Sequence, residues 1–217
     1  MATWVTHFRI AETLLHEEPS LDRIAFLVGN IGPDCGLVGE DGRPVPPKSI
    51  THFKQDGQLP SELFKQQYLN DLEQASNVTR SYLLGYYLHL VTDEHWIQLT
   101  TAKKRESPVQ EIVGTPDYTR LVKTDWYGVD FQYLATHPEH IFWTDFRHVQ
   151  SFEDVLPFFP QGQTAQQIRN ITTFYETHTL EANHVFRYMH PHDIDLFIDR
   201  TLVALRSSLS SLLRQSV

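Results

Sequence analysis

The chain has 217 residues, which predicts one domain spanning residues 1–217 with a sizeable core. A formal net charge of −9 argues against an extended nucleic-acid-binding surface, and a charged content of 21% is ordinary for a globular protein. The first residues do not resemble a signal peptide, no apolar run approaches the roughly 20 residues that span a bilayer, and the single cysteine is Cys35. We therefore expect a cytoplasmic protein without a transmembrane segment.

The first part of the chain has helical hydrophobic spacing that is interrupted by one long loop. Apolar residues recur three and four positions apart over residues 6–17, where Thr6 is the expected N-cap. A second helix is expected to have Ser20 as its N-cap and to end in GNIGPDCG, because three glycines and a proline do not continue a helix. Residues 35–50 have the composition of a loop.

Helical spacing then resumes and continues towards the C-terminus. The expected helices cover residues 60–75, 77–99, 124–136, 151–158 (with Ser151 as the cap), 164–189 and 193 onward. Residues 101–110 are polar and are predicted to form a solvated connection. The sequence has no alternating pattern long enough to indicate a strand, so the predicted fold is all-α, a single multi-helix domain.

The last predicted helix is amphipathic. Its sequence LVALRSSLSSLLRQ carries an apolar face that must be covered. It is expected to pack either on its own domain or on a second subunit, which makes a homo-oligomer one possibility.

Four predicted segments each carry side chains that can bind a divalent metal ion. His7 lies on the apolar face of the first helix, Asp34 follows the second helix, and His52 follows the loop. An HxxxD spacing places His89 and Asp93 one turn apart on the same helix face. Zinc favours imidazole nitrogen and carboxylate oxygen, although Fe, Mn and Ni accept the same ligands. The pattern predicts a site for one to three divalent ions, with Zn as the first choice.

Each of these residues also has a purely structural interpretation. A histidine on a helix face is often a hydrogen-bonded part of the core, and Asp34 can turn or cap the chain. His89 and Asp93 can form an internal hydrogen bond. A metal site can in turn be catalytic, with a bound water as the nucleophile that attacks a phosphorus or carbonyl centre, or closed and structural. A noncatalytic, metal-stabilised or ligand-binding helical module is therefore the alternative to a hydrolase.

The stretch PHD at residues 191–193 raises a second enzymatic alternative, an HD-type phosphohydrolase. That class requires a neighbouring histidine and aspartate as metal ligands. Here His192 and Asp193 follow Pro191 at an expected helix start. Asp193 is therefore predicted to cap the helix, and His192 to lie on the surface.

The motifs, taken in order, resemble a known family. The helical His7, GxxxPD ending at Asp34, THF at residues 51–53 and GYYLHLVTDEHW at residues 85–96 resemble the zinc-dependent phospholipase C family in its short bacterial form. The resemblance covers roughly the first hundred residues. It implies an all-α fold related to phospholipase C and the S1/P1-type nucleases, a zinc centre, and hydrolysis of a small phosphoester or phospholipid-like substrate.

The resemblance also implies roles for individual residues. His52, His89, Asp34 and Asp93 would hold one ion, Asp93 would bridge to a second ion that His7 also binds, and Asp34 would be the catalytic base. The sequence departs from the family elsewhere: Trp4 is internal, whereas the family uses an N-terminal tryptophan, and the later HxxxE pair is absent. The residues left open as ligands of a further ion are Asp125, His137, His140, His148 and His178.

Overall fold

The computed structural model describes residues 1–39 and 42–215, and these residues are mostly helical. The elements of the first half are α1 (Trp4–Glu17), α2 (Arg23–Gly29), the 3-10 turn η1 (Gly32–Asp34), the strands β1 (Leu37–Val38) and β2 (Pro44–Val45), α3 (Lys48–Thr51), α4 (Pro60–Tyr68), η2 (Leu72–Gln74) and α5 (Asn77–Lys103). Those of the second half are α6 (Val109–Ile112), α7 (Tyr118–Thr136), α8 (Ile141–Thr144), η3 (Phe146–His148), α9 (Gln163–Thr177) and α10 (Pro191–Gln215). The all-α prediction is confirmed.

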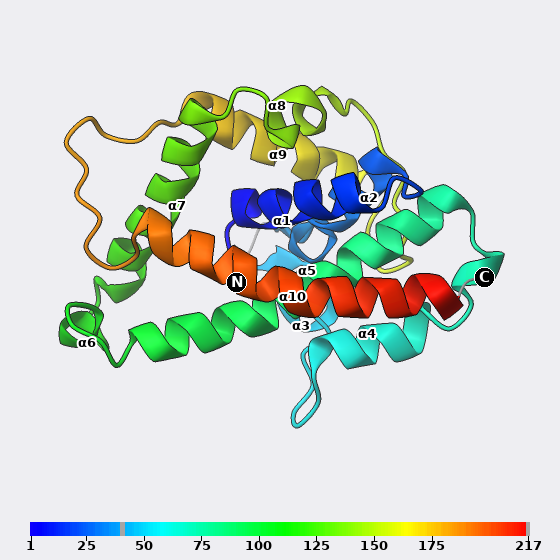
Figure 1. Ribbon diagram of the computed structural model, residues 1–217, viewed down its shortest axis with the longest axis horizontal. Coiled ribbons are helices and arrows are strands. Elements are labelled where there is room, and N and C mark those ends of the chain that lie inside the picture. Colours follow the sequence, from blue (N-terminus) through cyan, green and yellow to red (C-terminus); the bar gives the residue numbers. More distant parts are fainter. Residues whose placement is uncertain (40–41, 216–217) are drawn as a thin grey trace.

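Helix α5 is the central element of the fold. It packs against α2 and α4, and α10 covers both α5 and α1 (Figure 1). Its N-terminus is capped by Ser76, whose hydroxyl accepts a hydrogen bond from the backbone N–H of Thr79 at 3.1 Å. Every residue of its middle stretch, from Ser81 to Asp93, is buried. A helix surrounded in this way brings polar side chains into the interior, where they need partners.

Helices α2 and α5 cross with their backbones in contact, and two glycines allow this. A Cβ atom at Gly29 would lie 2.1 Å from the carbonyl oxygen of Tyr82, and one at Gly85 would lie 2.3 Å from the carbonyl oxygen of Phe26. No larger side chain fits at this crossing without separating the helices. The close approach brings Asn30, the C-cap of α2, beside α5.

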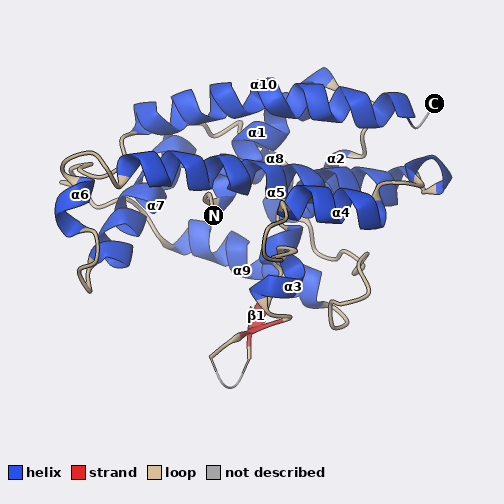
Figure 2. Cartoon of the chain, turned by 90° about the horizontal axis from the view of Figure 1, so that it is seen from below, coloured by secondary structure: helices blue, strands red, loops and turns tan. Residues whose placement is uncertain are grey.

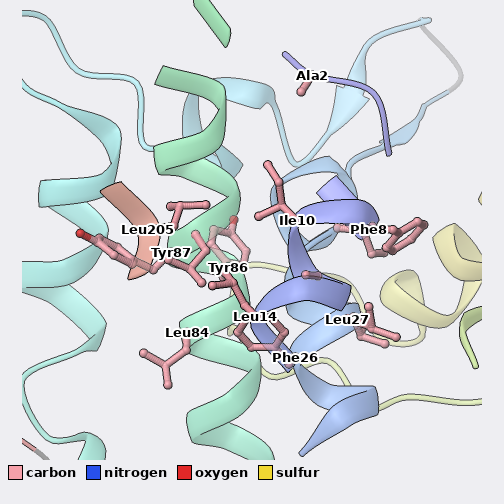
Figure 3. Packing of buried hydrophobic residues seen from close by; sticks show 14 of the residues in the cluster. Ala2, Phe8, Ile10, Leu14, Phe26, Leu27, Leu84, Tyr86, Tyr87 and Leu205 are labelled. Atoms are coloured by element: carbon pink, nitrogen blue, oxygen red, sulfur yellow. The ribbon is translucent and has the colours of Figure 1, made fainter. Parts of the chain in front are cut away.

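The hydrophobic core is one cluster that includes residues from Ala2 to Leu212. Figure 3 shows its centre, where Ile10 and Leu14 of α1 lie with Phe26 of α2 and Tyr86 of α5. Figure 2 shows α10 lying along one side of the molecule, while the β1–β2 hairpin projects from the opposite side. The hairpin is a two-stranded antiparallel sheet with Leu37 paired to Val45.

Two N-cap predictions were wrong. Helix α1 begins at Trp4 with Thr3 as its N-cap, and Thr6 is buried within the helix. Helix α2 is capped by Asp22, whose carboxylate accepts from the backbone N–H of Ala25 at 2.9 Å, rather than by Ser20. In both cases several residues that can cap lie close together, and the position that fits the core decides among them.

Residues 35–50 and 60–75 also differ in part from their predictions. The predicted loop contains the β1–β2 hairpin and the start of α3, while its residues 40–41 lie outside the described part of the chain. The predicted helix 60–75 ends as α4 at Tyr68, and a 3-10 turn follows.

The helix predicted at residues 151–158 is absent, although residues 151–158 are all described. Ser151 caps no helix there. Asp154 instead accepts a hydrogen bond from the backbone N–H of Thr164 at 2.9 Å, within the first turn of α9. The carboxylate therefore satisfies an unpaired N–H of a neighbouring helix start, and Pro157 disfavours a helix in its own segment.

The helix predicted at residues 164–189 ends at Thr177, and residues 178–190 form an irregular connection. Asp125 of α7 explains why. Its carboxylate accepts hydrogen bonds from the backbone N–H groups of Tyr188, Met189 and Arg187, the last at 2.8 Å. These N–H groups are therefore hydrogen-bonded to a side chain and not to the backbone carbonyl groups of an α-helix.

Other boundaries shift as well. Helix α5 continues to Lys103, into the predicted connection 101–110, and that stretch also contains the start of α6. Helix α7 begins at Tyr118 rather than near residue 124. Propensity and spacing locate a helix better than they locate its ends.

The apolar face of α10 is covered by the chain itself. Its residues Phe197, Leu205 and Leu209 are buried, and the helix packs on α1 and α5. Helix α10 thus packs on its own chain, and its packing on a second subunit stays a prediction. Among the described residues, no helix has both the length and the apolar character that crossing a membrane requires.

Candidate metal centre

The five predicted ligand residues converge at one place. His7 comes from α1, Asp34 from η1, His52 from the end of α3, and His89 and Asp93 from α5. All five are buried, with exposed fractions between 0% for His7 and His89 and 9% for Asp34. These five polar side chains, from four elements, thus form one buried cluster.

Asp93 lies at the centre of this cluster. Its Oδ1 is 3.6 Å from His7 Nε2, and its Oδ2 is 3.7 Å from His52 Nε2 and 3.5 Å from His89 Nε2. Asp34 Oδ1 lies 3.5 Å from the same nitrogen of His52. These separations are too long for hydrogen bonds. They are close to the edge of a tetrahedron with metal–ligand bonds of ~2.1 Å, which is about 3.4 Å.

Among residues 1–39 and 42–215, two groups of three side chains have ligand atoms within 4.8 Å of one another. The first is His7, His89 and Asp93, and the second is Asp34, His52 and His89. His89 belongs to both groups. The family resemblance implies that Asp93 bridges two ions. In the structure, the residue that the two groups share is His89.

Several ligand atoms in the cluster have no hydrogen-bond partner within the described residues. They are His7 Nε2, His52 Nε2, His89 Nε2 and Asp93 Oδ2, and all four are buried. An unpaired buried polar atom costs about 1–3 kcal/mol, so four together need an explanation. A divalent ion would supply the partner, and three imidazoles with two carboxylates are ligands that zinc accepts. The residues present therefore fit a metal ion.

Two of the three histidine rings, those of His89 and His52, have a polar partner at Nδ1. His89 Nδ1 donates a hydrogen bond to the backbone carbonyl of Asn30 at 2.7 Å, and His52 Nδ1 lies 3.1 Å from the hydroxyl of Thr51. A bond at Nδ1 leaves Nε2 as the atom directed at the cluster, which is the usual arrangement behind a metal-binding imidazole. The glycine crossing of α2 and α5 thereby positions His89.

A strained residue follows His52. Phe53 has a φ of 48°, the left-handed region that side chains other than glycine seldom adopt. Such a conformation costs on the order of 1–3 kcal/mol and persists where packing holds it. Phe53 packs edge-on against Phe64, with ring centroids 5.2 Å apart, and against Tyr86. The aromatic contacts thus hold the sharp turn that ends α3 at His52.

The charge states of the cluster suit metal binding near neutral pH. Burial lowers the pKa of His7 to about 4 and also lowers the pKa of His52. Burial alone would raise the pKa values of Asp93 and Asp34, but neighbouring imidazoles hold both below their ordinary range. For His89, the effect of burial is outweighed by Asp93, so its pKa is raised. Ionised carboxylates and a neutral His7 are the forms that a cation binds.

Sequence reasoning missed three groups that contact the carboxylates. The indole N–H of Trp4 donates to Asp34 Oδ2 at 3.0 Å, and the backbone N–H of Ala2 donates to Asp93 Oδ1 at 2.8 Å. Lys48 Nζ lies 3.6 Å from Asp34 Oδ1. A signal existed for two of them, since Trp4 is one turn before His7 on α1 and Lys48 is four residues before His52.

A further buried carboxylate anchors the N-terminal segment next to the cluster. Asp130 of α7 accepts hydrogen bonds from the hydroxyl of Thr3 at 2.7 Å and from that of Tyr175 at 2.6 Å. Burial raises the pKa of Asp130 to about 7, although both hydroxyls act in the opposite direction. Thr3 is thereby held between the residues that contact Asp93 and Asp34.

The remaining candidate ligands lie in other environments. Neither of the two groups with ligand spacing in the described part of the chain contains Asp125, His137, His140, His148 or His178. The HD pair is likewise separate, because His192 is exposed and the Asp193 carboxylate forms an ion pair with Lys103 at 2.9 Å. Helix α10 begins at Pro191, so Asp193 is its third residue and not the predicted N-cap. Its carboxylate accepts from the backbone N–H of His190, the residue before the helix, at 2.9 Å.

Comparisons with models of protein families, with curated proteins and with solved structures found no match to this chain. The likeness to phospholipase C therefore stays an expectation based on the ordered motifs.

Proposed function

We propose that this protein is a metal-dependent hydrolase of phosphoester bonds, with a fold related to phospholipase C and the P1-type nucleases. The observation that carries the proposal is the buried cluster in which three imidazole nitrogens and a carboxylate oxygen converge without hydrogen-bond partners. A purely structural network of histidines and aspartates would pair these atoms with one another at hydrogen-bonding distance. Here the Asp93 oxygens lie 3.5 to 3.7 Å from the three Nε2 atoms, which is a spacing expected of atoms that bind the same metal ion.

The number of ligands supports a catalytic centre over a closed one. Each of the two groups offers three protein atoms. Catalytic zinc sites commonly have three protein ligands and keep a further position for water or substrate, whereas structural sites have four. The noncatalytic module remains the competing hypothesis, in which all five residues would close around the metal.

The side chains have distinct tasks in this proposal. A divalent ion bound here would lower the pKa of a coordinated water and polarise a phosphoryl oxygen. His7, His89 and Asp93 would hold an ion at one group, and Asp34, His52 and His89 would hold an ion at the other. Asp34 is ionised, its Oδ2 accepts the indole N–H of Trp4, and its carboxylate is the proposed base that receives a proton from the attacking water.

The test begins with protein whose metal content is measured after purification without added metal. We expect hydrolysis of bis(nitrophenyl) phosphate that chelation abolishes and a divalent ion restores. Asp34→Asn keeps an oxygen for the metal but accepts no proton, so it should retain metal while losing about 10²-fold or more in rate. His192→Ala is the control, because that residue is exposed and should change neither quantity.

One result would decide for the noncatalytic module. If the fully metallated wild type hydrolyses no phosphomonoester, phosphodiester or phospholipid between mildly acidic and mildly alkaline pH, the hydrolase proposal fails.

A further inference from the structure

Lys48 places a positive charge at the border between the cluster and solvent. It begins α3, and its Nζ lies 3.6 Å from Asp34 Oδ1. The Lys48 side chain is 45% exposed, whereas the Asp34 side chain is 6% exposed. A single ammonium group therefore contacts a buried carboxylate on one side and is open to solvent on the other.

The hydrogen-bonding capacity of Lys48 is largely unused. The distance to Asp34 is that of an ion pair and exceeds a hydrogen bond. Its other polar contact within the described residues is to the sulfur of Met1 at 3.0 Å, and a thioether is a weak acceptor. An ammonium group has three donors. These donors are available to an anion that approaches from solvent.

The position of Lys48 is unfavourable for metal binding alone. Asp34 Oδ1 lies 3.6 Å from the Lys48 ammonium and 3.5 Å from His52 Nε2, so the ammonium is next to a ligand atom. A positive charge there repels a cation at the same ligands. An anion that contacts both the ion and the ammonium removes this conflict, and lysine is a common phosphate ligand.

We propose that Lys48 binds a phosphoryl oxygen of the substrate, which identifies the substrate class as phosphoesters with at least one negatively charged oxygen. This inference rests on the proposed function. Lys48 is the exposed first residue of α3 and its side chain is 45% exposed, so a phosphoryl group can approach its ammonium from the solvent side. Lys48 is then a substrate-binding residue, distinct from the residues that hold the ion.

The experiment measures the binding of inorganic phosphate to metal-loaded protein by titration calorimetry, together with metal affinity. Lys48→Met should weaken phosphate binding about tenfold or more, the scale of one charge-assisted hydrogen bond. It should leave metal affinity unchanged or increase it, because a repelling charge is lost. Lys48→Arg should recover much of the phosphate affinity. Lys54→Met is the matched control, since Lys54 is exposed and forms no ion pair within the described residues.

The outcomes separate this inference from the proposed function. Unchanged phosphate affinity in Lys48→Met, or a loss of metal from that variant, overturns the inference, and so does a metallated wild type that binds no phosphate at millimolar concentration. If phosphate binding depends on Lys48 but no phosphoester is hydrolysed, the inference stands and the hydrolase proposal fails. If hydrolysis occurs and Lys48→Met binds phosphate normally, the inference alone fails.

Discussion

The glycine crossing between α2 and α5 makes the substitution Gly85→Ala informative. The added methyl group would lie 2.3 Å from the carbonyl oxygen of Phe26 and 3.0 Å from the backbone nitrogen of Asn30. Both atoms are backbone atoms, of α2 and of its C-cap residue, so the clash cannot be relieved by rotation of a side chain. The helices must separate by roughly 1 Å to restore an ordinary contact, in a core that is packed to crystal-like density.

The expected cost follows from two opposing effects. Alanine favours a helix over glycine by about 1 kcal/mol, whereas overpacking of a core costs typically 1–3 kcal/mol and sometimes more. Because the clash at Gly85 is with backbone, we expect the larger end of that range and a net loss of about 2 kcal/mol in the free energy of unfolding. The separation also moves His89, one turn further along α5, away from the Asn30 carbonyl that it contacts at 2.7 Å. Metal affinity should therefore fall as well.

Urea unfolding in the presence of a chelator measures the first effect, and equilibrium dialysis against Zn measures the second. Gly128→Ala is the control, because the nearest atoms to its new methyl group are side-chain atoms of Leu180, Phe186 and His184 at 3.1–3.3 Å. That variant should stay within about 1 kcal/mol of wild type and bind metal normally. If Gly85→Ala is as stable as wild type and binds metal equally well, the crossing does not position His89.

Two further predictions concern the cluster and its neighbour Asp130. Asp93→Ala should reduce bound metal more than His7→Ala does, measured as metal per chain, because Asp93 lies within 3.7 Å of three imidazoles; equal losses would contradict this. Asp130 has a pKa of about 7 when folded, so between pH 4 and 7 the folded state keeps a proton that the unfolded chain has released. The retained proton on Asp130 thus stabilises the folded state at low pH, and this stabilisation is lost as pH rises through 7. The free energy of unfolding should therefore decrease by roughly 3 kcal/mol between pH 5 and 8. Asp130→Asn should remove this decrease in urea unfolding at the two pH values, and an unchanged pH dependence in the variant would refute it.

Local patterns predicted where the long helices lie. HxxxD on a continuous apolar helix placed His89 and Asp93 together, and α5 is indeed a single helix. The long helices α1 and α7 were also located, apart from their ends. Spacing succeeds here because neighbours three and four residues apart lie on one face in any environment.

The missed features depend on residues that are distant in the sequence. The segment 178–190 has an irregular backbone because Asp125, more than fifty residues earlier, accepts its N–H groups. Trp4 and Lys48 reach Asp34 only in the folded chain. The convergence of the five predicted ligands likewise depends on how α1, α2 and α5 pack. Sequence indicated which side chains have the chemistry, and the packing determines their distances.

The arrangement of the helices has a consequence for the order in which the cluster forms during synthesis. Asp34, His52, His89 and Asp93 lie on η1, α3 and α5, and these elements contact one another or α2 and α4, all within the first 103 residues. His7 lies on α1, which packs against α2 and α5 but also against α8 and α10. Because a chain emerges N-terminus first, the partners of α1 are complete only after α10 has been made. Helix α5 is also covered by α10, so the surroundings of His7, His89 and Asp93 are complete only after the C-terminal helix has been made.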